Sequence, residues 1–88
     1  MTPFSIVLRP SVEKDLRPLP SDVVVRIIER VESLAVEPFP RQAIKLGGAE
    51  HVYRVRVGDY RVIYEVDTRA HQIIIHHVRH RSEAYRQL

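Results

Sequence analysis

The sequence predicts an α+β domain in which two N-terminal helices pack on a mainly antiparallel four-stranded sheet, in the order β-α-α-β-β-β with a short C-terminal helix. Three observations favour this class. A β-branched run comes first, helical periodicity follows it up to residue 35, and alternating apolar residues fill much of the chain between residues 52 and 78. The length of 88 residues predicts a single domain over 1–88.

The first strand and the first helix are expected before residue 18. The run Phe4–Arg9 is rich in apolar and β-branched residues and predicts a strand, which Pro10 would end. Ser11 is the expected N-cap of a short helix over Val12–Arg17, because its hydroxyl can accept a hydrogen bond from a free N–H of the first turn. Pro18 then breaks the chain.

A longer helix is expected from Ser21 or Asp22, either of which can act as the N-cap, to about Ala35. Its apolar residues recur at helical spacing with charged residues between them, which predicts one face packed against a sheet. Prolines punctuate the connection over residues 37–42, and Ala43–Leu46 is expected to extend briefly before a Gly-Gly pair.

The C-terminal part predicts three consecutive antiparallel strands. They are expected at Val52–Val57, Tyr60–Val66 and Gln72–Val78, the last of them running slightly longer if the pattern continues. Gly58-Asp59 forms a two-residue hairpin turn, with glycine supplying the positive φ. Ser82 is the expected cap of a last helical turn that continues through Tyr85 to Leu88.

The positive charge of the chain is concentrated in this C-terminal part. The net charge is +3, and residues 51–88 hold seven arginines against four acidic residues, while the charges of residues 1–50 balance. Arginine offers a planar fork that fits phosphate and stacks on bases. A localised arginine field indicates a polyanion or an acidic protein as partner, and the alternative is a solvated basic face.

The composition also argues against several kinds of protein. There is no cysteine, so neither disulfides nor thiolate metal sites are expected, and no apolar run approaches the roughly 20 residues of a membrane span. The first residues lack the layout of a signal peptide, and we expect a cytoplasmic protein. His76 and His77 with His80 raise the question of a metal site. None is predicted, because neighbouring strand residues point to opposite sides.

Strand alternation assigns the two faces of the expected hairpin, because successive side chains point to opposite sides. Arg54 and Arg56 share one face of their strand, and Arg61 lies on the polar face of the next one. The residues expected to pack in the core are Tyr53, Tyr60 and Tyr64.

For the last strand the pattern does not decide which face packs in the core, because isoleucines occupy both of its faces. Unbroken alternation places Arg79 with Ile75, and it places His80 with Val78. The pattern alone therefore does not decide which of these polar residues lies on the face of the other arginines.

Four motifs occur in a specific order and spacing in this chain. They are K-L-G-G from Lys45, Y-R-V-R-V from Tyr53, G-D-Y-R-V-I-Y from Gly58, and V-R-H-R-S-E-A-Y from Val78. In this order the motifs resemble those of the RelE/ParE toxin superfamily, specifically its RelE-like branch. The resemblance covers essentially the whole chain.

The resemblance implies a toxin of a type II toxin–antitoxin system that enters the ribosomal A site and cleaves mRNA. Such an endoribonuclease lets the ribose 2′-OH attack the adjacent phosphate while the 5′-oxygen leaves, and it needs no metal or other cofactor. The implied partners are the ribosome, its mRNA and an acidic antitoxin encoded nearby, with which a heterotetramer is expected. The chemistry needs a proton acceptor, cations near the phosphate and nucleotides held in line.

The resemblance also assigns site roles to individual residues. Arg61 stands where the family has a phosphate-contacting arginine on a strand, and Arg79 stands where it has a second one before the C-terminal helix, with Arg81 as the alternative. Tyr85 matches a C-terminal tyrosine that stacks on the mRNA or orients it. The expected RNA contacts are Arg54, Arg56, Arg61, Arg79, Arg81 and Tyr85.

Two further catalytic candidates depart from the family pattern. Arg54 and Arg56 occupy positions that are lysines in the best-known RelE, and arginine is a poor base because its pKa lies above ~12. They act either by electrostatics alone or beside another proton acceptor. His80 is the first candidate for that acceptor, with His77 and Glu65 as alternatives, since a histidine exchanges protons near neutral pH.

Two other functions remain open from the sequence. One is a ParE-like toxin of the same fold that inhibits gyrase and cuts nothing, although that branch generally lacks the C-terminal arginine and tyrosine present here. The other is a catalytically inactive antitoxin-binding or RNA-binding module. The alternative to a site role for these residues is that Arg61 pairs with Glu65 or Asp59, and that Arg54 and Arg56 form a solvated face or a seat for an antitoxin.

Overall fold

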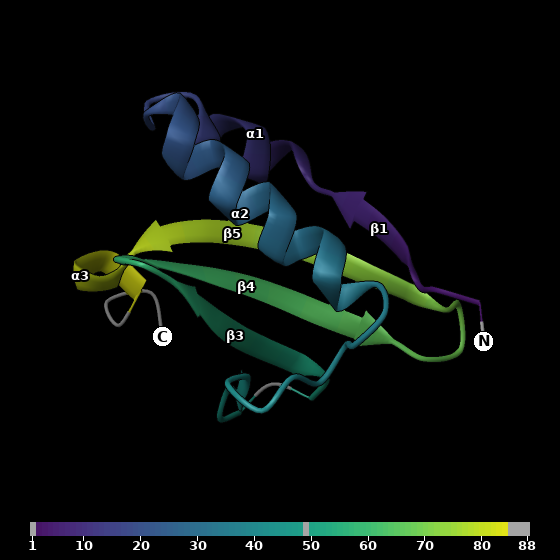
Figure 1. The fold of residues 1–88 in the computed structure, drawn as a ribbon. Coiled ribbons are helices and arrows are strands. Elements are labelled where there is room, and N and C mark those ends of the chain that lie inside the picture. The colour runs from purple at the N-terminus through teal and green to yellow at the C-terminus, as the bar shows by residue number, and fades with distance from the viewer. Residues whose placement is uncertain (1, 49, 85–88) are drawn as a thin grey trace.

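The computed structural model describes residues 2–48 and 50–84, which form a layer of helices on a five-stranded sheet (Figure 1). The elements are β1 (Ser5–Leu8), α1 (Pro10–Leu16), α2 (Ser21–Leu34), β2 (Ile44–Lys45), β3 (Val52–Val57), β4 (Tyr60–Asp67), β5 (Gln72–His80) and α3 (Arg81–Ala84). The strand order is β1-β5-β4-β3-β2. The predicted α+β class is confirmed. No helix within the described ranges is long and apolar enough to span a membrane.

The sheet has one strand more than predicted, because the short extension after the proline-rich connection is paired. Ile44 lies opposite Arg54 and Lys45 lies opposite Tyr53, so β2 joins the outer edge of β3. The expectation of a mainly antiparallel sheet is confirmed, since only β1 runs parallel to its neighbour, β5.

Helix α1 starts earlier than expected and uses its serine differently. Its N-cap is Arg9 and the helix begins at Pro10, where proline is tolerated because the first-turn N–H groups have no partner within the helix. The prediction that Ser11 caps this helix was wrong. Its hydroxyl donates a 2.6 Å hydrogen bond to the backbone oxygen of His76 on β5. Helix α1 thus covers the part of the β5 edge that lies beyond the end of β1.

The N-caps expected for the other two helices were also wrong. Helix α2 begins at Ser21 with Pro20 as its N-cap and has no side-chain cap, but it ends where predicted, with Ala35 as its C-cap. Helix α3 begins at Arg81, so Ser82 lies inside its first turn. The expected continuation of this helix over residues 85–88 lies outside the described residues.

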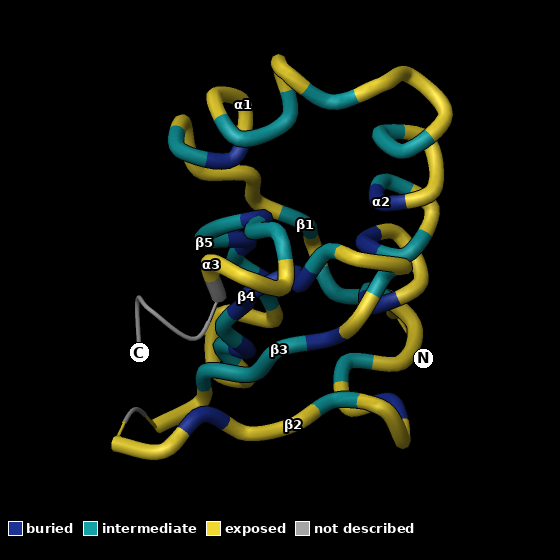
Figure 2. The backbone as a smooth tube through the Cα atoms, turned by 90° about the vertical axis from the view of Figure 1, so that its left-hand side faces the viewer, coloured by how far each residue is buried: buried dark blue, intermediate teal, exposed yellow. Residues whose placement is uncertain are grey.

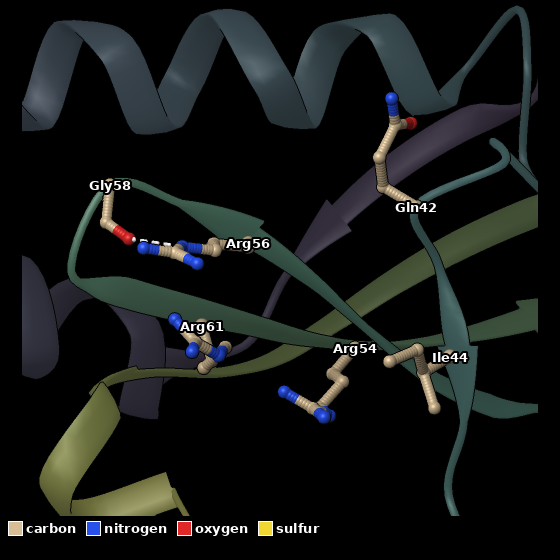
Figure 3. A pocket seen from close by; sticks show the side chains of 6 residues that line it. All are labelled: Gln42, Ile44, Arg54, Arg56, Gly58 and Arg61. Atoms are coloured by element: carbon tan, nitrogen blue, oxygen red, sulfur yellow. Dashed lines mark hydrogen bonds between the residues drawn. The ribbon is translucent and has the colours of Figure 1, made fainter.

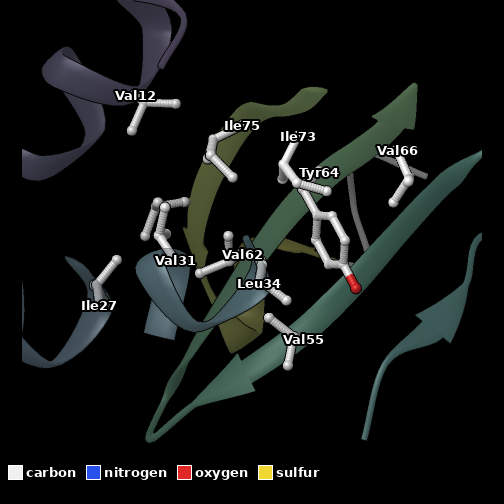
Figure 4. Packing of buried hydrophobic residues seen from close by; sticks show 11 residues of the cluster. Val12, Ile27, Val31, Leu34, Val55, Val62, Tyr64, Val66, Ile73 and Ile75 are labelled. Atoms are coloured by element: carbon white, nitrogen blue, oxygen red, sulfur yellow. The ribbon is translucent and has the colours of Figure 1, made fainter. Parts of the chain in front are cut away.

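The core lies between helices α1 and α2 and one face of the sheet (Figures 2 and 4). Its buried members are Val12, Ile27, Val31, Leu34, Val55, Val62, Tyr64, Val66, Ile73, Ile75 and Val78. Tyr64 is fully buried, and its hydroxyl donates a 2.9 Å hydrogen bond to the backbone oxygen of Pro38. Burial raises the pKa of Tyr64 to about 12. The prediction that the three strand tyrosines pack in the core is confirmed, with Tyr53 and Tyr60 half-buried against it.

A β-bulge interrupts β5 and changes which of its residues face the helices. Tyr64 lies opposite Ile75, whereas Ile63 lies opposite His77, so His76 is the extra residue. The alternation of side chains therefore shifts by one residue within this strand. Residues before and after the bulge that would share a face in a regular strand lie on opposite faces.

Candidate functional site

A row of arginines crosses the open face of the sheet, which is the face away from α1 and α2. Arg56 on β3 lies opposite Arg61 on β4, and Arg61 lies opposite Arg79 on β5. Residues paired in this way share a face and have their Cβ atoms about 5 Å apart. Like charges at this separation repel one another, so the row costs the sheet stability and attracts an anion.

The β5 bulge brings Arg79 into this row. Unbroken alternation would place Arg79 with Ile75, and that expectation was wrong because of the extra residue. The same shift turns His80 to the helix side, opposite Tyr60, where the two rings meet edge to face with centroids 5.4 Å apart. The structure thus brings Arg79 together with Arg61 on the open face and places the side chain of His80 on the helix side.

Arg61, at the centre of the row, is a buried charge. It is 7% exposed, and its Nη1 donates a long hydrogen bond of 3.4 Å to the backbone oxygen of Tyr60. Its Nε has no hydrogen-bond partner in the described part of the chain. Within residues 2–48 and 50–84 it forms no ion pair with Glu65 or Asp59, and Glu65 contacts His76 instead. A buried cation without a carboxylate costs folding energy, so Arg61 is better suited to a ligand than to stability.

A cavity of about 500 Å³ opens beside Arg61 (Figure 3). Its lining residues are Gln42, Ile44, Arg54, Arg56, Gly58 and Arg61. Arg56 is oriented by a 2.9 Å hydrogen bond from its Nε to the backbone oxygen of Gly58. Gly58 has a φ of 59°, which glycine adopts without strain and which closes the β3–β4 turn. Figure 3 shows the three guanidinium groups gathered along this side of the hairpin.

The far end of the row is partly neutralised by a carboxylate of α1. Nη1 of Arg79 lies 2.8 Å from Oδ1 of Asp15, whose side chain is 13% exposed. Oδ2 of the same carboxylate accepts a 3.0 Å hydrogen bond from the backbone N–H of Val78 and lies 3.5 Å from Nδ1 of His77. Asp15 therefore fixes the end of the row nearest α1.

Sequence reasoning missed Asp15 and the part of the cavity wall that Gln42 and Ile44 provide. No motif marks Asp15, since an acidic residue that follows Glu13 and Lys14 in a short amphipathic helix is ordinarily a solvent-facing one. The sequence did not reveal Gln42 and Ile44 for a different reason. Their position depends on the pairing of a two-residue strand, which is too short to produce a periodic pattern.

The two neighbouring histidines of the bulge point to the same side of the sheet. His76 is close to Glu65 of the open face, with Nε2 and Oε1 2.9 Å apart, and His77 pairs with Ile63 of the same face. The expectation that they point to opposite sides was wrong, because a bulge places two consecutive residues against one. Even so, no group of three potential metal ligands comes together in the described part of the chain.

Arg81, one of the predicted RNA contacts, is the first residue of α3. Arg81 is exposed, and its backbone N–H donates a 2.7 Å hydrogen bond to the backbone oxygen of Asp59, which anchors α3 to the β3–β4 turn. Tyr85 lies outside the described residues. Arg54 is half-buried and lines the cavity next to the row.

Comparisons with known proteins agree with this architecture. Residues 6–85 match the family model of the ParE toxin of type II toxin–antitoxin systems. The putative toxin RelE1 of Methanocaldococcus jannaschii is 35% identical over 86 residues, which cover 94% of this chain and 96% of that protein. Toxin RelE of Mycobacterium tuberculosis is 29% identical over 89 residues, covering 96% of this chain and 88% of that one.

Solved structures give the same result. The archaeal RelE–RelB complex from Pyrococcus horikoshii contains a chain that is 37% identical and superposes with a TM-score of 0.80, covering 92% of this chain and 97% of that one. The isolated RelE toxin of Escherichia coli has a TM-score of 0.76 at 20% identity and shares the fold. The fold and the matches define a toxin of a type II toxin–antitoxin system. The chain belongs to the RelE/ParE superfamily, and its curated relatives are RelE toxins, as its motifs predicted.

Proposed function

We propose that this protein is a ribosome-dependent mRNA endonuclease that stops translation by cutting mRNA in the ribosomal A site. The observation that carries the proposal is the buried guanidinium of Arg61, which stands in the centre of an arginine row with no carboxylate partner among the described residues. Negative charge grows on a phosphate when a hydroxyl attacks it. Cations that are already in place stabilise that charge without having to reorganise.

The proposed reaction needs no external nucleophile. The ribose 2′-oxygen forms a bond to the adjacent phosphorus, the bond from phosphorus to the 5′-oxygen breaks, and the products end in a 2′,3′-cyclic phosphate and a 5′-hydroxyl. Arg61 contacts the attacked phosphate, and Arg56 and Arg54 extend the charge along the cavity. Arg79 holds the other side of the phosphate from a position that Asp15 fixes. These guanidinium groups supply the positive charge, which supports a metal-independent mechanism.

The remaining predicted residues have supporting roles in this proposal. Tyr85 stacks on a base to hold the nucleotides in line, and Arg81 binds the mRNA backbone beside α3. In this proposal His80 is not assigned as the acceptor of the 2′-OH proton, because its ring lies on the helix side and its Nδ1 accepts a 3.3 Å hydrogen bond from the backbone N–H of Ser82. His80 instead fixes the start of α3.

An antitoxin is the second proposed partner. Structures of RelE relatives from Mycobacterium tuberculosis and Pyrococcus horikoshii were solved as complexes with their RelB partners. The excess positive charge of residues 51–88 favours an acidic segment that covers the arginine row. We propose that such an antitoxin controls this protein in the cytoplasm, where its ribosomal target resides, and the heterotetramer stays a prediction.

The test is incubation of the purified protein with ribosomes programmed with a defined mRNA, followed by mapping of the fragment ends. The proposal expects a cut within the A-site codon and a 2′,3′-cyclic or 3′-phosphate on the upstream fragment. An mRNA with a 2′-deoxy nucleotide at the cut position should stay intact, because it lacks the nucleophile. Intact mRNA in both cases would overturn the proposal.

A gyrase inhibitor is the second candidate, because the matching family model describes ParE toxins. A DNA supercoiling assay with purified gyrase separates the two functions. Inhibited supercoiling together with intact ribosome-bound mRNA would replace the proposed function by this one.

A further inference from the structure

A histidine–aspartate pair joins β5 to α1 beside the arginine row. His77 pairs in register with Ile63, so its side chain lies on the open face. Arg61 lies two residues before Ile63 on β4, so its side chain is on the same face. His77 and Arg61 are therefore diagonal neighbours, roughly 7–8 Å apart between Cα atoms. A group in this position can reach a phosphate, or a ribose next to it, that Arg61 holds.

The carboxylate of Asp15 faces one side of the imidazole ring. Nδ1 of His77 lies 3.5 Å from Oδ2 of Asp15, and this buried nitrogen makes no hydrogen bond among residues 2–48 and 50–84. Such contacts are often long in free enzymes and shorten when the substrate binds. The carboxylate is anchored, because it also accepts the N–H of Val78 and pairs with Arg79.

The other side of the ring faces solvent. Nδ1 of His77 is buried, whereas the side chain as a whole is 40% exposed. The exposed surface therefore belongs to the remaining ring atoms, which include Nε2. With its hydrogen on Nδ1 and directed at Asp15, the neutral ring leaves the lone pair of Nε2 available as a proton acceptor.

The neighbouring histidines lack this combination of position and free ring nitrogen. Nε2 of His76 is 2.9 Å from Oε1 of Glu65, and Nε2 of His71 is 2.7 Å from the backbone oxygen of Thr2. His80 lies on the helix side of the sheet. Over residues 2–48 and 50–84, His77 is the histidine that combines a place on the arginine face with an unengaged Nε2.

We propose that His77 accepts the proton of the attacking 2′-OH and that Asp15 is its positioning residue. This role rests on the proposed mRNA cleavage. As the bond between the 2′-oxygen and phosphorus forms, the hydroxyl proton moves to Nε2 of His77. The bond from phosphorus to the 5′-oxygen breaks, and the 5′-oxygen takes a proton from water. Asp15 stabilises the resulting imidazolium. The pair thus supplies the base that Arg54 and Arg56 do not provide.

The first test is the rate of cleavage of ribosome-bound mRNA at saturating protein. We expect His77→Ala to cleave about 100-fold more slowly or worse, the usual range for a lost general base. His71→Ala is the matched control and should cleave at the wild-type rate, since this histidine lies in the β4–β5 turn, outside the row of Arg56, Arg61 and Arg79. Added imidazole should restore part of the rate of His77→Ala but none of the rate of Arg61→Ala.

Each outcome of this experiment decides the role. Wild-type cleavage together with an unchanged rate for His77→Ala would overturn the role and leave the proposed function standing. A loss that imidazole does not restore, or a rescuable loss in His80→Ala in place of His77→Ala, would overturn it as well. Intact mRNA with the wild-type protein would overturn the proposed function and this role together.

The positioning residue has a separate test. Asp15→Asn keeps an oxygen for the N–H of Val78 but removes the negative charge that faces His77. We expect the cleavage rate at saturation to fall while ribosome binding, measured by co-sedimentation, stays the same. In the free protein, nitrogen NMR shifts of His77 should show the hydrogen on Nδ1 in wild type. A hydrogen on Nε2 would contradict the assignment.

Discussion

The two faces of the sheet differ in what their side chains do, and the contrast is sharpest between neighbours on β4. Val62 is fully buried against the helices in an apolar core. Arg61 is almost as buried on the other face, but its charge has no carboxylate partner among the described residues. The first kind of burial stabilises the fold, and the second opposes it. This difference indicates that the helix side holds the domain together and that the open face serves a ligand.

The largest effect that we expect is the loss of cleavage rate in Arg61→Ala, on the open face. Cleavage of ribosome-bound mRNA should slow by about 100- to 1000-fold, because a cation placed for the transition state is lost. Arg61→Lys is the control. It keeps the charge without the planar fork and should lose less activity. A cleavage rate equal to wild type in Arg61→Ala would show that the open face is not the reaction site.

The helix side is tested by Ile75→Ala, which removes a fully buried side chain from the core. The free energy of unfolding should fall by about 2–5 kcal/mol through lost burial and the cavity left behind. Denaturant titration followed by circular dichroism measures it. The neighbouring Ile74 is half-buried on the open face, so Ile74→Ala is a matched control and should cost clearly less.

A smaller effect on the free energy of unfolding is expected at high pH, where Tyr64 loses its proton. Its pKa is about 12 in the folded protein against 10.0 ordinarily, so the folded state holds the proton more tightly. The stability that this gives is fully present below pH 10 and is lost as the pH rises towards 12, by roughly 2–3 kcal/mol in all. In Tyr64→Phe the fall in unfolding free energy over this pH range should be smaller. An equal fall in both proteins would contradict the assignment.

The smallest expected effect concerns the edge of β5 that α1 covers. Ser11→Ala removes the hydrogen bond to the backbone oxygen of His76 and should lower the free energy of unfolding by about 1 kcal/mol. Ser33→Ala is the control, because the exposed hydroxyl of Ser33 donates its hydrogen bond within its own helix, to the backbone oxygen of Arg30. Hydrogen exchange at the amides of β5 should increase in Ser11→Ala alone.

The local sequence pattern was sufficient to predict the elements whose apolar residues recur with a regular period over many residues. The alternation over β3 and β4, with a Gly-Asp turn between them, predicted the hairpin that carries Arg54, Arg56 and Arg61. The helical period predicted α2 and its end at Ala35. Both patterns depend on contacts between neighbours in sequence, which a single sequence records.

The parts that pattern missed depend on contacts between distant segments. The bulge at His76 decides the faces of Arg79 and His80, and it follows from how β5 fits both β4 and α1 rather than from any local signal. The pattern missed Asp15 for the same reason, since its partners in the site lie more than 60 residues away in the chain.

The central claim is that the helix side of the sheet stabilises the fold and that the open face carries the reaction site. Parallel measurements on variants of two neighbouring residues test it most directly. The free energy of unfolding and the rate of mRNA cleavage per folded molecule are measured for Arg61→Ala and Val62→Ala. We predict that Arg61→Ala keeps or gains stability and loses cleavage, whereas Val62→Ala loses about 2 kcal/mol of stability and keeps its cleavage rate. Loss of cleavage in proportion to loss of stability in both variants would contradict it.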